Sequence, residues 1–217
     1  MNILCIETAS TNCSVALAKD GNLLALKEDY SNGFSHAERL HIFIRDILEE
    51  NNIELSNLDA IAVSKGPGSY TGLRIGVSAA KGLCFSLGIP LISVSTLTAL
   101  AYQVKEKELV VTMLDARRME VYTAVFDKDR GQILETSAKI LDENSYLEYL
   151  EKGPVYFIGS GVTKFKEICR HPNANFIQEK LPSANEMVEL AISKYKVSDF
   201  EDVAYFEPYY LKDFMAG

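Results

Sequence analysis

Acidic, hydroxylated and glycine residues follow predicted strands in both halves of the chain, where they could bind a nucleotide. Carboxylates at such positions can hold a metal-bound phosphate, and hydroxyl and backbone N–H groups can bind phosphate oxygens. The residues alone favour a simpler interpretation, because Asp, Ser and Thr also stabilise turns without any ligand. The candidate nucleotide cleft comprises Glu7, Ser10, Thr11, Asp115, Arg117, Gly159 and Gly161.

Other catalytic and metal-binding motifs are not found in the sequence. The loop GPGSYTG at residues 66–72 matches neither the GK[ST] ending of a Walker loop nor the spacing of GxGxxG. His36 and His41 lie five positions apart. On a helix they would point about 140° apart, so they do not form a zinc site. A Ser–His–Asp triad is not supported either, since there is no nucleophile elbow. We therefore assign no catalytic residue and no metal site.

The stretch from residue 58 to residue 88 is predicted to hold a buried strand, a glycine loop and a helix at 71–87. Ser69 or Thr71 is the expected N-cap, and Gly88 is expected just after the last helical residue. Small residues recur every four positions along this helix, and such positions share one face. We call this set the small-residue ridge: Gly72, Gly76, Ala80, Cys84 and Gly88.

The small-residue ridge needs a compensating contact, because glycine inside a helix costs about 0.5–1 kcal/mol relative to alanine. The loop could bind an anion at the start of the helix, or the ridge could let another helix approach closely. That second helix could belong to this chain or to a partner. We interpret the ridge chiefly as a docking surface. Gly76→Leu or Ala80→Arg should then abolish partner binding and leave the fold intact.

The two halves of the chain repeat one pattern. Asp20-Gly21 is a strong hairpin signal within a three-stranded meander, and Glu7 and Asp115, 108 positions apart, end the first strand of each meander. Each meander precedes another strand, a glycine loop and a helix. This predicts a duplicated two-lobed α/β fold, with chance similarity of two meanders as the alternative. The expected lobes are residues 1–104 and 105–217, with the last helix and tail packing back on the first lobe.

Composition limits the classes of function. The chain has 217 residues and a net charge of −8, which argues against nucleic-acid binding by this chain alone through a broad basic face. We expect neither a signal peptide nor a transmembrane helix, because the sequence opens on a strand pattern and contains no apolar run of membrane-spanning length. The four cysteines form no CxxC pair and are expected to be reduced core thiols of a cytoplasmic protein.

Five segments together resemble the TsaB (YeaZ) family from end to end: ILCIETAS, SHAERL, GPGSYTGLRIG, DARRMEVY and EPYYLK. The resemblance implies a fold like actin, the Hsp70 ATPase domain and the sugar kinases. It also implies a non-catalytic subunit that activates TsaD, with the ATPase TsaE, in threonylcarbamoylation of the adenosine next to the anticodon of tRNA. TsaD binds a metal through a pair of helix histidines. This chain has no second histidine four residues after His36.

The resemblance further implies that TsaD binds to helices 35–51 and 71–87. ATP and magnesium would be used by the complex and not bound by this chain alone, tRNA would bind only through the complex, and the chain alone would form a homodimer. The alternatives are an ATP-binding phosphotransferase or ATPase acting alone, and a metalloprotease, which the old glycoprotease label suggests. The expected interface residues are His36, Arg39, Leu40, Phe43, Gly72, Leu73, Gly76, Val77, Ala80, Lys81 and Cys84.

Overall fold

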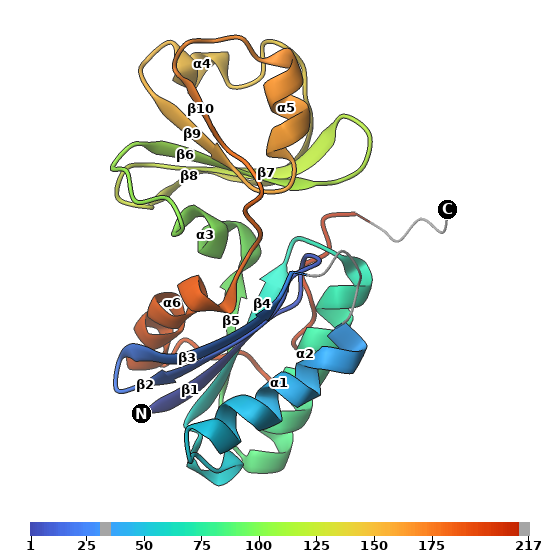
Figure 1. Ribbon diagram of the computed structural model, residues 1–217, viewed down its shortest axis with the longest axis vertical. Helices are drawn as coiled ribbons and strands as arrows, with labels where there is room; N and C mark the ends of the chain where they lie inside the picture. Colours follow the sequence, from blue (N-terminus) through green and yellow to red (C-terminus); the bar gives the residue numbers. More distant parts are fainter. Residues whose placement is uncertain (31–35, 213–217) are drawn as a thin grey trace. The chain divides into compact units, whose positions relative to one another are not determined.

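The computed structural model describes residues 1–30 and 36–212, which form two compact units (Figure 1). The first unit comprises Met1–Ala99 together with the chain from Pro182 onward, and the second comprises Leu100–Leu181. The structure thus places the boundary after Ala99, where the sequence placed it after residue 104. The last helix and the tail belong to the first unit, which is built from both ends of the chain.

A five-stranded mixed sheet forms the centre of the first unit. Its strand order is β3-β2-β1-β4-β5, in which β1 to β3 form an antiparallel meander and β4 and β5 add in parallel. Asp20 and Gly21, both with positive φ, form the predicted hairpin between β2 and β3. The strands are β1 (Asn2–Glu7), β2 (Cys13–Lys19), β3 (Asn22–Asp29), β4 (Ala60–Gly66) and β5 (Leu91–Ser95).

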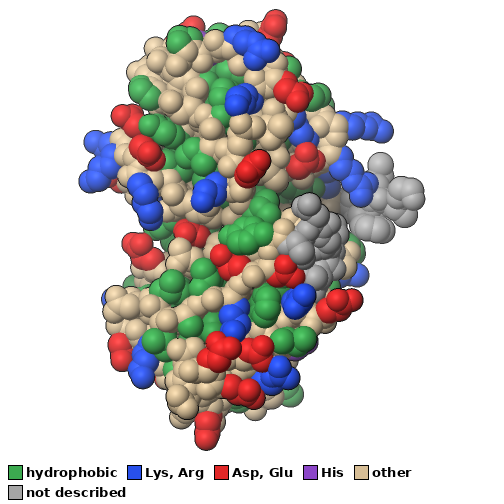
Figure 2. Space-filling view, viewed as in Figure 1, with side chains coloured by type: hydrophobic (Ala, Val, Ile, Leu, Met, Phe, Trp, Pro, Cys, Tyr) green, Lys and Arg blue, Asp and Glu red, His purple; other side chains and the backbone are tan. Residues whose placement is uncertain are grey.

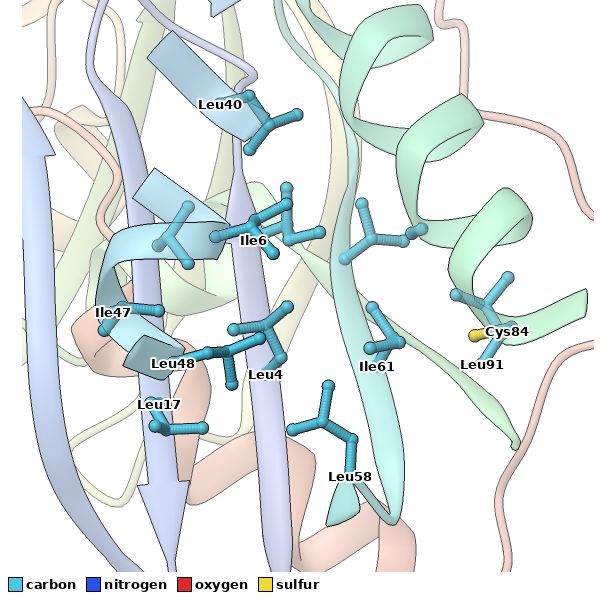
Figure 3. Packing of buried hydrophobic residues seen from close by; sticks show 14 of the residues in the cluster. Leu4, Ile6, Leu17, Leu40, Ile47, Leu48, Leu58, Ile61, Cys84 and Leu91 are labelled. Atoms are coloured by element: carbon cyan, nitrogen blue, oxygen red, sulfur yellow. The ribbon is translucent and has the colours of Figure 1, made fainter. Parts of the chain in front are cut away.

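Helices cover both faces of this sheet. Because side chains alternate along a strand, Leu4 and Ile6 of β1 pack with α1 and α2, whereas Ile3 and Cys5 pack with α6. Figure 3 shows side chains of the sheet, α1 and α2 that meet in the first of these two cores. The helices of this unit are α1 (His36–Glu50), α2 (Tyr70–Leu87), α3 (Thr96–Ala101, at the boundary) and α6 (Ala184–Lys196), with a short 3-10 turn at Leu55–Asn57.

Both ends of α2 have the predicted caps. The Ser69 hydroxyl accepts a hydrogen bond from the Gly72 N–H at 3.2 Å, and Gly88 adopts a left-handed conformation with φ of 67°. The expected cap of α1, Ser35, lies outside the described residues. Within residues 1–30 and 36–212, no helix has both the length and the apolar character needed to span a bilayer.

The second unit repeats the topology of the first. Its strand order is β10-β9-β6-β7-β8, so β6 corresponds to β1, with a meander on one side and parallel strands on the other. This confirms the duplicated two-lobed α/β fold of the actin, Hsp70 and sugar-kinase class. Its core contains an aromatic cluster of Tyr146, Phe157, Phe165 and Phe176. The elements are β6 (Leu109–Asp115), β7 (Glu120–Phe126), β8 (Gln132–Ile140), α4 (Leu147–Leu150), β9 (Val155–Ile158), α5 (Val162–Ile168) and β10 (Ala174–Ile177).

Candidate functional site

Apart from Gly88, which is exposed just after the helix, the small-residue ridge of α2 packs inside the first unit. A Cβ atom added to Gly72 would overlap the carbonyl oxygen of Thr8, and one added to Gly76 would overlap the Thr8 hydroxyl. That hydroxyl donates a hydrogen bond to the Gly72 carbonyl oxygen at 2.8 Å. The two glycines therefore let α2 lie directly against the chain that follows β1. This contact explains the ridge and corrects its interpretation as an exposed docking surface.

Most of the expected interface residues share this burial. Leu40, Leu73, Val77, Ala80 and Cys84 are at most 4% exposed and belong to the core of the first unit. Buried side chains cannot provide a surface, so these positions act within the chain. The substitutions Gly76→Leu and Ala80→Arg would consequently damage the fold, contrary to the expectation from the sequence.

The remaining expected interface residues have partners within the chain as well. His36 is buried, and its Nε2 lies 2.7 Å from the carbonyl oxygen of Ser10. Burial lowers the pKa of this imidazole. Phe43 packs half-buried against the core, whereas Arg39 is exposed. The Arg39 Nε lies 3.4 Å from Oδ2 of Asp29, the last residue of β3. Lys81 donates hydrogen bonds to the tail, as described below.

The surface that α2 leaves to solvent is a different set of residues. Arg74, Ser78, Gly82 and Phe85 are exposed and follow one another at spacings of three and four, so they share one side of the helix. We call this set the outer face of α2. The Phe85 side chain is 85% exposed, and a Cβ atom on Gly82 would meet nothing within 4 Å. The spacing of these four residues is visible in the sequence, but the regular four-residue repeat of the small-residue ridge is easier to recognise.

The tail lies beside the outer face of α2. Lys81 Nζ donates hydrogen bonds to the carbonyl oxygens of Ala204 and Phe206, at 3.2 and 2.8 Å. Between these two anchored residues the Tyr205 side chain is 84% exposed. Two large aromatic side chains, Phe85 and Tyr205, are thus exposed on α2 and on the tail that it anchors. The sequence predicted that the tail packs back on the first lobe, but it did not indicate that Tyr205 is exposed.

Glu7 lies at the end of β1, as predicted, but it is fully buried. Its Oε1 accepts a hydrogen bond from the Ala9 N–H at 2.6 Å, and burial raises the pKa of the carboxyl group to about 7. Nearby in the candidate cleft, the Ser10 hydroxyl accepts a bond from the Asn12 N–H, and Thr11 is half-buried. These polar groups stabilise the turn after β1, which agrees with the simpler interpretation of their types.

The candidate-cleft residues of the second unit form a well-ordered turn after β6. Asp115 Oδ2 pairs with Lys164 Nζ at 2.8 Å, and Asp115 Oδ1 accepts a hydrogen bond from the Arg117 N–H at 2.7 Å. The Asp115 N–H donates to the Ser160 hydroxyl at 3.0 Å. Lys164 and Ser160 were not among the predicted site residues. Ser160 lies within the glycine turn and Lys164 follows it, so pairing that turn with the Asp115 turn would have pointed to both.

Gly159 and Gly161 serve close packing in this unit. A Cβ atom on Gly159 would overlap the carbonyl oxygen of Met113, and one on Gly161 would lie 2.6 Å from a methyl group of Val121. The glycine turn therefore rests directly on β6 and β7. Glu7, Ser10 and Thr11 belong to the first unit, whereas Asp115, Arg117 and the two glycines belong to the second.

The cysteine side chains of the described residues are poorly suited to nucleophilic or metal-binding chemistry. All four cysteines are free and buried, and desolvation raises the pKa of Cys5, Cys13 and Cys84 to about 12. Thiols of such high pKa are poor nucleophiles at neutral pH. Within the described part of the chain, no group of three or more His, Cys, Asp or Glu side chains could hold a metal ion.

Comparison with known proteins agrees with the resemblance seen in the sequence. The family model described as "TsaD: tRNA N6-adenosine threonylcarbamoyltransferase" matches residues 33–216. The tRNA threonylcarbamoyladenosine biosynthesis protein TsaB of Escherichia coli is 31% identical over 100% of this chain and 96% of its own length. The TsaB protein of Haemophilus influenzae is 30% identical over 98% and 94%.

Solved structures agree with these matches. An uncharacterized Pseudomonas aeruginosa protein with similarity to peptidase YeaZ superimposes with a TM-score of 0.86 at 28% identity, covering 97% of this chain and 99% of its own. YeaZ from the same organism gives a TM-score of 0.81 at 30% identity, with the same coverage. The full-length sequence matches, the duplicated topology and the structural neighbours lead to one conclusion: the chain belongs to the TsaB (YeaZ) family.

Proposed function

We propose that this chain is a non-catalytic subunit that pairs with a TsaD-type transferase, and with the ATPase TsaE, in threonylcarbamoylation of the adenosine next to the anticodon of tRNA. Near full-length matches to proteins named for tRNA threonylcarbamoyladenosine biosynthesis support the pathway. The match of the TsaD family model to residues 33–216 supports common ancestry with the transferase itself.

The outer face of α2 is the observation that carries the docking role. Phe85 is a large apolar side chain that is 85% exposed. Aromatic and arginine side chains dominate the binding energy of protein interfaces, and Arg74 lies on the same face as Phe85. Gly82 between them leaves room for a partner backbone to approach closely. We therefore expect the partner to cover this face, with the buried ridge fixing the position of α2 from behind.

Further exposed apolar side chains lie on the elements that contact α2. Tyr205 adds a second aromatic side chain on the tail, next to the residues that Lys81 anchors. On α1, which contacts α2, Ile42 is 41% exposed. Exposed apolar side chains that lie on adjacent elements are typical of protein interaction sites. In the absence of a transferase subunit, a second copy of this chain would cover the same residues and give a symmetric dimer.

The state of the reactive groups supports an accessory role. Glu7 is buried in the first unit with its pKa near 7, His36 is bonded to a backbone carbonyl, and the raised pKa values of the thiols keep them protonated. These groups contribute to the fold. We expect ATP and magnesium to be used by the assembled complex, tRNA to bind that complex, and the chain to be cytoplasmic.

Co-purification with a TsaD-type subunit tests the proposal. Phe85→Asp places a charge on the outer face, and we expect it to weaken pairing by at least about 30-fold, the loss typical of an aromatic hot spot. Val197→Asp is the matched control, because Val197 is 74% exposed at the end of α6. This control should pair normally. If Phe85→Asp retains full affinity while correctly folded, the docking surface is wrong.

The alternative is an ATP-binding protein that acts alone. Its support is the turn of the second unit, where Asp115 and Lys164 lie near a glycine turn. The corresponding acid of the first unit, Glu7, is fully buried. Its raised pKa disfavours the ionised carboxylate that would bind the metal ion of a metal-bound phosphate. Calorimetric titration of the isolated chain with ATP and magnesium separates the two functions. We expect no micromolar binding and no turnover.

A further inference from the structure

Two consecutive arginines adopt an unfavourable backbone conformation in the turn between β6 and β7. Arg117 has a φ of 69° and Arg118 a φ of 49°. Residues with a Cβ atom are uncommon in this left-handed region, and hairpin turns that require it usually use Gly, Asn or Asp. Backbone strain of this kind concentrates at functional sites, where the surrounding structure holds it in place.

The surrounding structure fixes this turn tightly. Asp115 Oδ1 accepts the hydrogen bond of the Arg117 N–H. Lys164 Nζ donates to the carbonyl oxygens of Arg118 and Glu120, at 2.6 and 3.1 Å, and pairs with Asp115 Oδ2. Lys164 itself is only 14% exposed. The lysine and the aspartate therefore neutralise each other while they hold the backbone of the two arginines.

The two guanidinium groups are left for solvent. Both side chains are exposed, and among the described residues neither makes a side-chain hydrogen bond or an ion pair. Asp115 already has a cationic partner, so it does not occupy them. Nothing in the described part of the chain uses the two positive charges that this strained turn presents. Both side chains are therefore accessible to an anionic ligand, and the planar guanidinium fork is suited to phosphate.

The charge distribution along the chain makes the second unit suitable for a polyanion. Residues 100–181 contain 12 lysines and arginines against 13 aspartates and glutamates. The remainder of the chain has 10 against 17, so the net charge of −8 resides almost entirely in the first unit. Figure 2 shows charged side chains of both signs interspersed on the visible face, without one broad basic patch. Phosphate contact would accordingly be local and would use a few residues.

We propose that Arg117 and Arg118 bind the phosphate backbone of tRNA in the assembled complex. The choice of RNA rests on the function proposed above. The contact positions the RNA and carries no sequence preference, because both side chains would meet phosphates and not base edges. Lys164 and Asp115 act as positioning residues that hold the turn.

The salt dependence of tRNA binding tests this contact. Fluorescence anisotropy of labelled tRNA with the assembled complex gives the slope of the logarithm of the binding constant against the logarithm of the salt concentration. This slope is negative, and each lost phosphate contact reduces its magnitude by about 1. The double variant Arg117→Ala with Arg118→Ala should reduce the magnitude by about 2. Arg117→Lys with Arg118→Lys keeps both charges and should keep most of the slope. The control Lys128→Ala with Lys152→Ala removes two exposed charges elsewhere on the second unit and should leave it unchanged.

Several results would overturn the proposal. An unchanged slope in the arginine-to-alanine variant would do so, as would an equal reduction of the slope in the control that replaces Lys128 and Lys152 by alanine. If the alanine variant loses binding of ATP or pyrophosphate and keeps tRNA binding, the arginines bind a nucleotide instead. The variant should still pair with the TsaD-type subunit, since Phe85 is intact. If the unmodified chain does not pair with a TsaD-type subunit, the proposed function is refuted; if it pairs and the salt slope does not depend on the two arginines, only this contact is refuted.

Discussion

Alanine substitutions at two glycines of α2 should change stability in opposite directions. At Gly82 an added Cβ meets nothing within 4 Å, so Gly82→Ala gains only helix propensity and should raise the free energy of unfolding by about 1 kcal/mol. At Gly72 the added Cβ overlaps the Thr8 carbonyl oxygen, which belongs to the backbone and cannot rotate away. Overpacking costs about 1–3 kcal/mol, so Gly72→Ala should lower the free energy of unfolding by about 1–2 kcal/mol after its propensity gain.

Gly76→Ala should fall between these two variants. Its Cβ overlaps the Thr8 hydroxyl, a side-chain atom that can move if it gives up its hydrogen bond to Gly72. Urea unfolding gives the three values, and hydrogen exchange of the β1 amides assigns the change to the first unit. If Gly72→Ala proves as stabilising as Gly82→Ala, the ridge is not an internal contact. The docking interpretation of the ridge would then return.

Three further predictions concern polar side chains that are buried or that hydrogen-bond to the backbone. Burial raises the pKa of the Glu7 carboxyl group from 4.5 to about 7, so the folded chain binds the carboxyl proton more tightly than the unfolded chain does. The free energy of unfolding should therefore fall by roughly 3 kcal/mol as pH rises from 4.5 through 7. Glu7→Gln should remove that slope from urea unfolding measured between pH 5 and pH 8, and equal slopes would contradict the assignment. Arg130 donates to three backbone carbonyls between residues 104 and 108, so Arg130→Ala should speed hydrogen exchange there and cost about 1–3 kcal/mol, with no rescue by lysine. Tyr146→Phe removes the buried bond to the Thr123 hydroxyl and should lower the thermal midpoint by about 2–4 °C, while an unchanged midpoint would mean that this bond contributes nothing.

Local signals in the sequence predicted the fold well. The Asp20-Gly21 turn, the Ser69 cap and the glycine after α2 each have a mechanism confined to a few residues, and all three are present. The duplication was also visible, because a repeated pattern is a property of the sequence itself. β10 was missed, since its four residues are all half-buried and show no alternation.

The candidate site was harder to predict because it depends on contacts between distant residues. The period of the ridge is plain, but the sequence does not say that Thr8, 64 positions before Gly72, fills it. Glu7 was placed correctly at a strand end, whereas its burial depends on the packing around that end. The exposed Phe85 carries no signal of its own, since a lone phenylalanine in a helix is usually part of a core.

The discontinuous first unit has a consequence for synthesis of the chain on the ribosome. The strands of its sheet emerge early, but α6, which covers Ile3 and Cys5, and the Pro182 carbonyl, which accepts a hydrogen bond from Asn12, emerge only after the second unit. The intervening second unit can complete its own sheet during that interval. Until α6 emerges, the first sheet exposes one apolar face, and exposed apolar surface of this kind favours aggregation and chaperone binding of the nascent chain. Completion of the first unit therefore follows synthesis of the second unit.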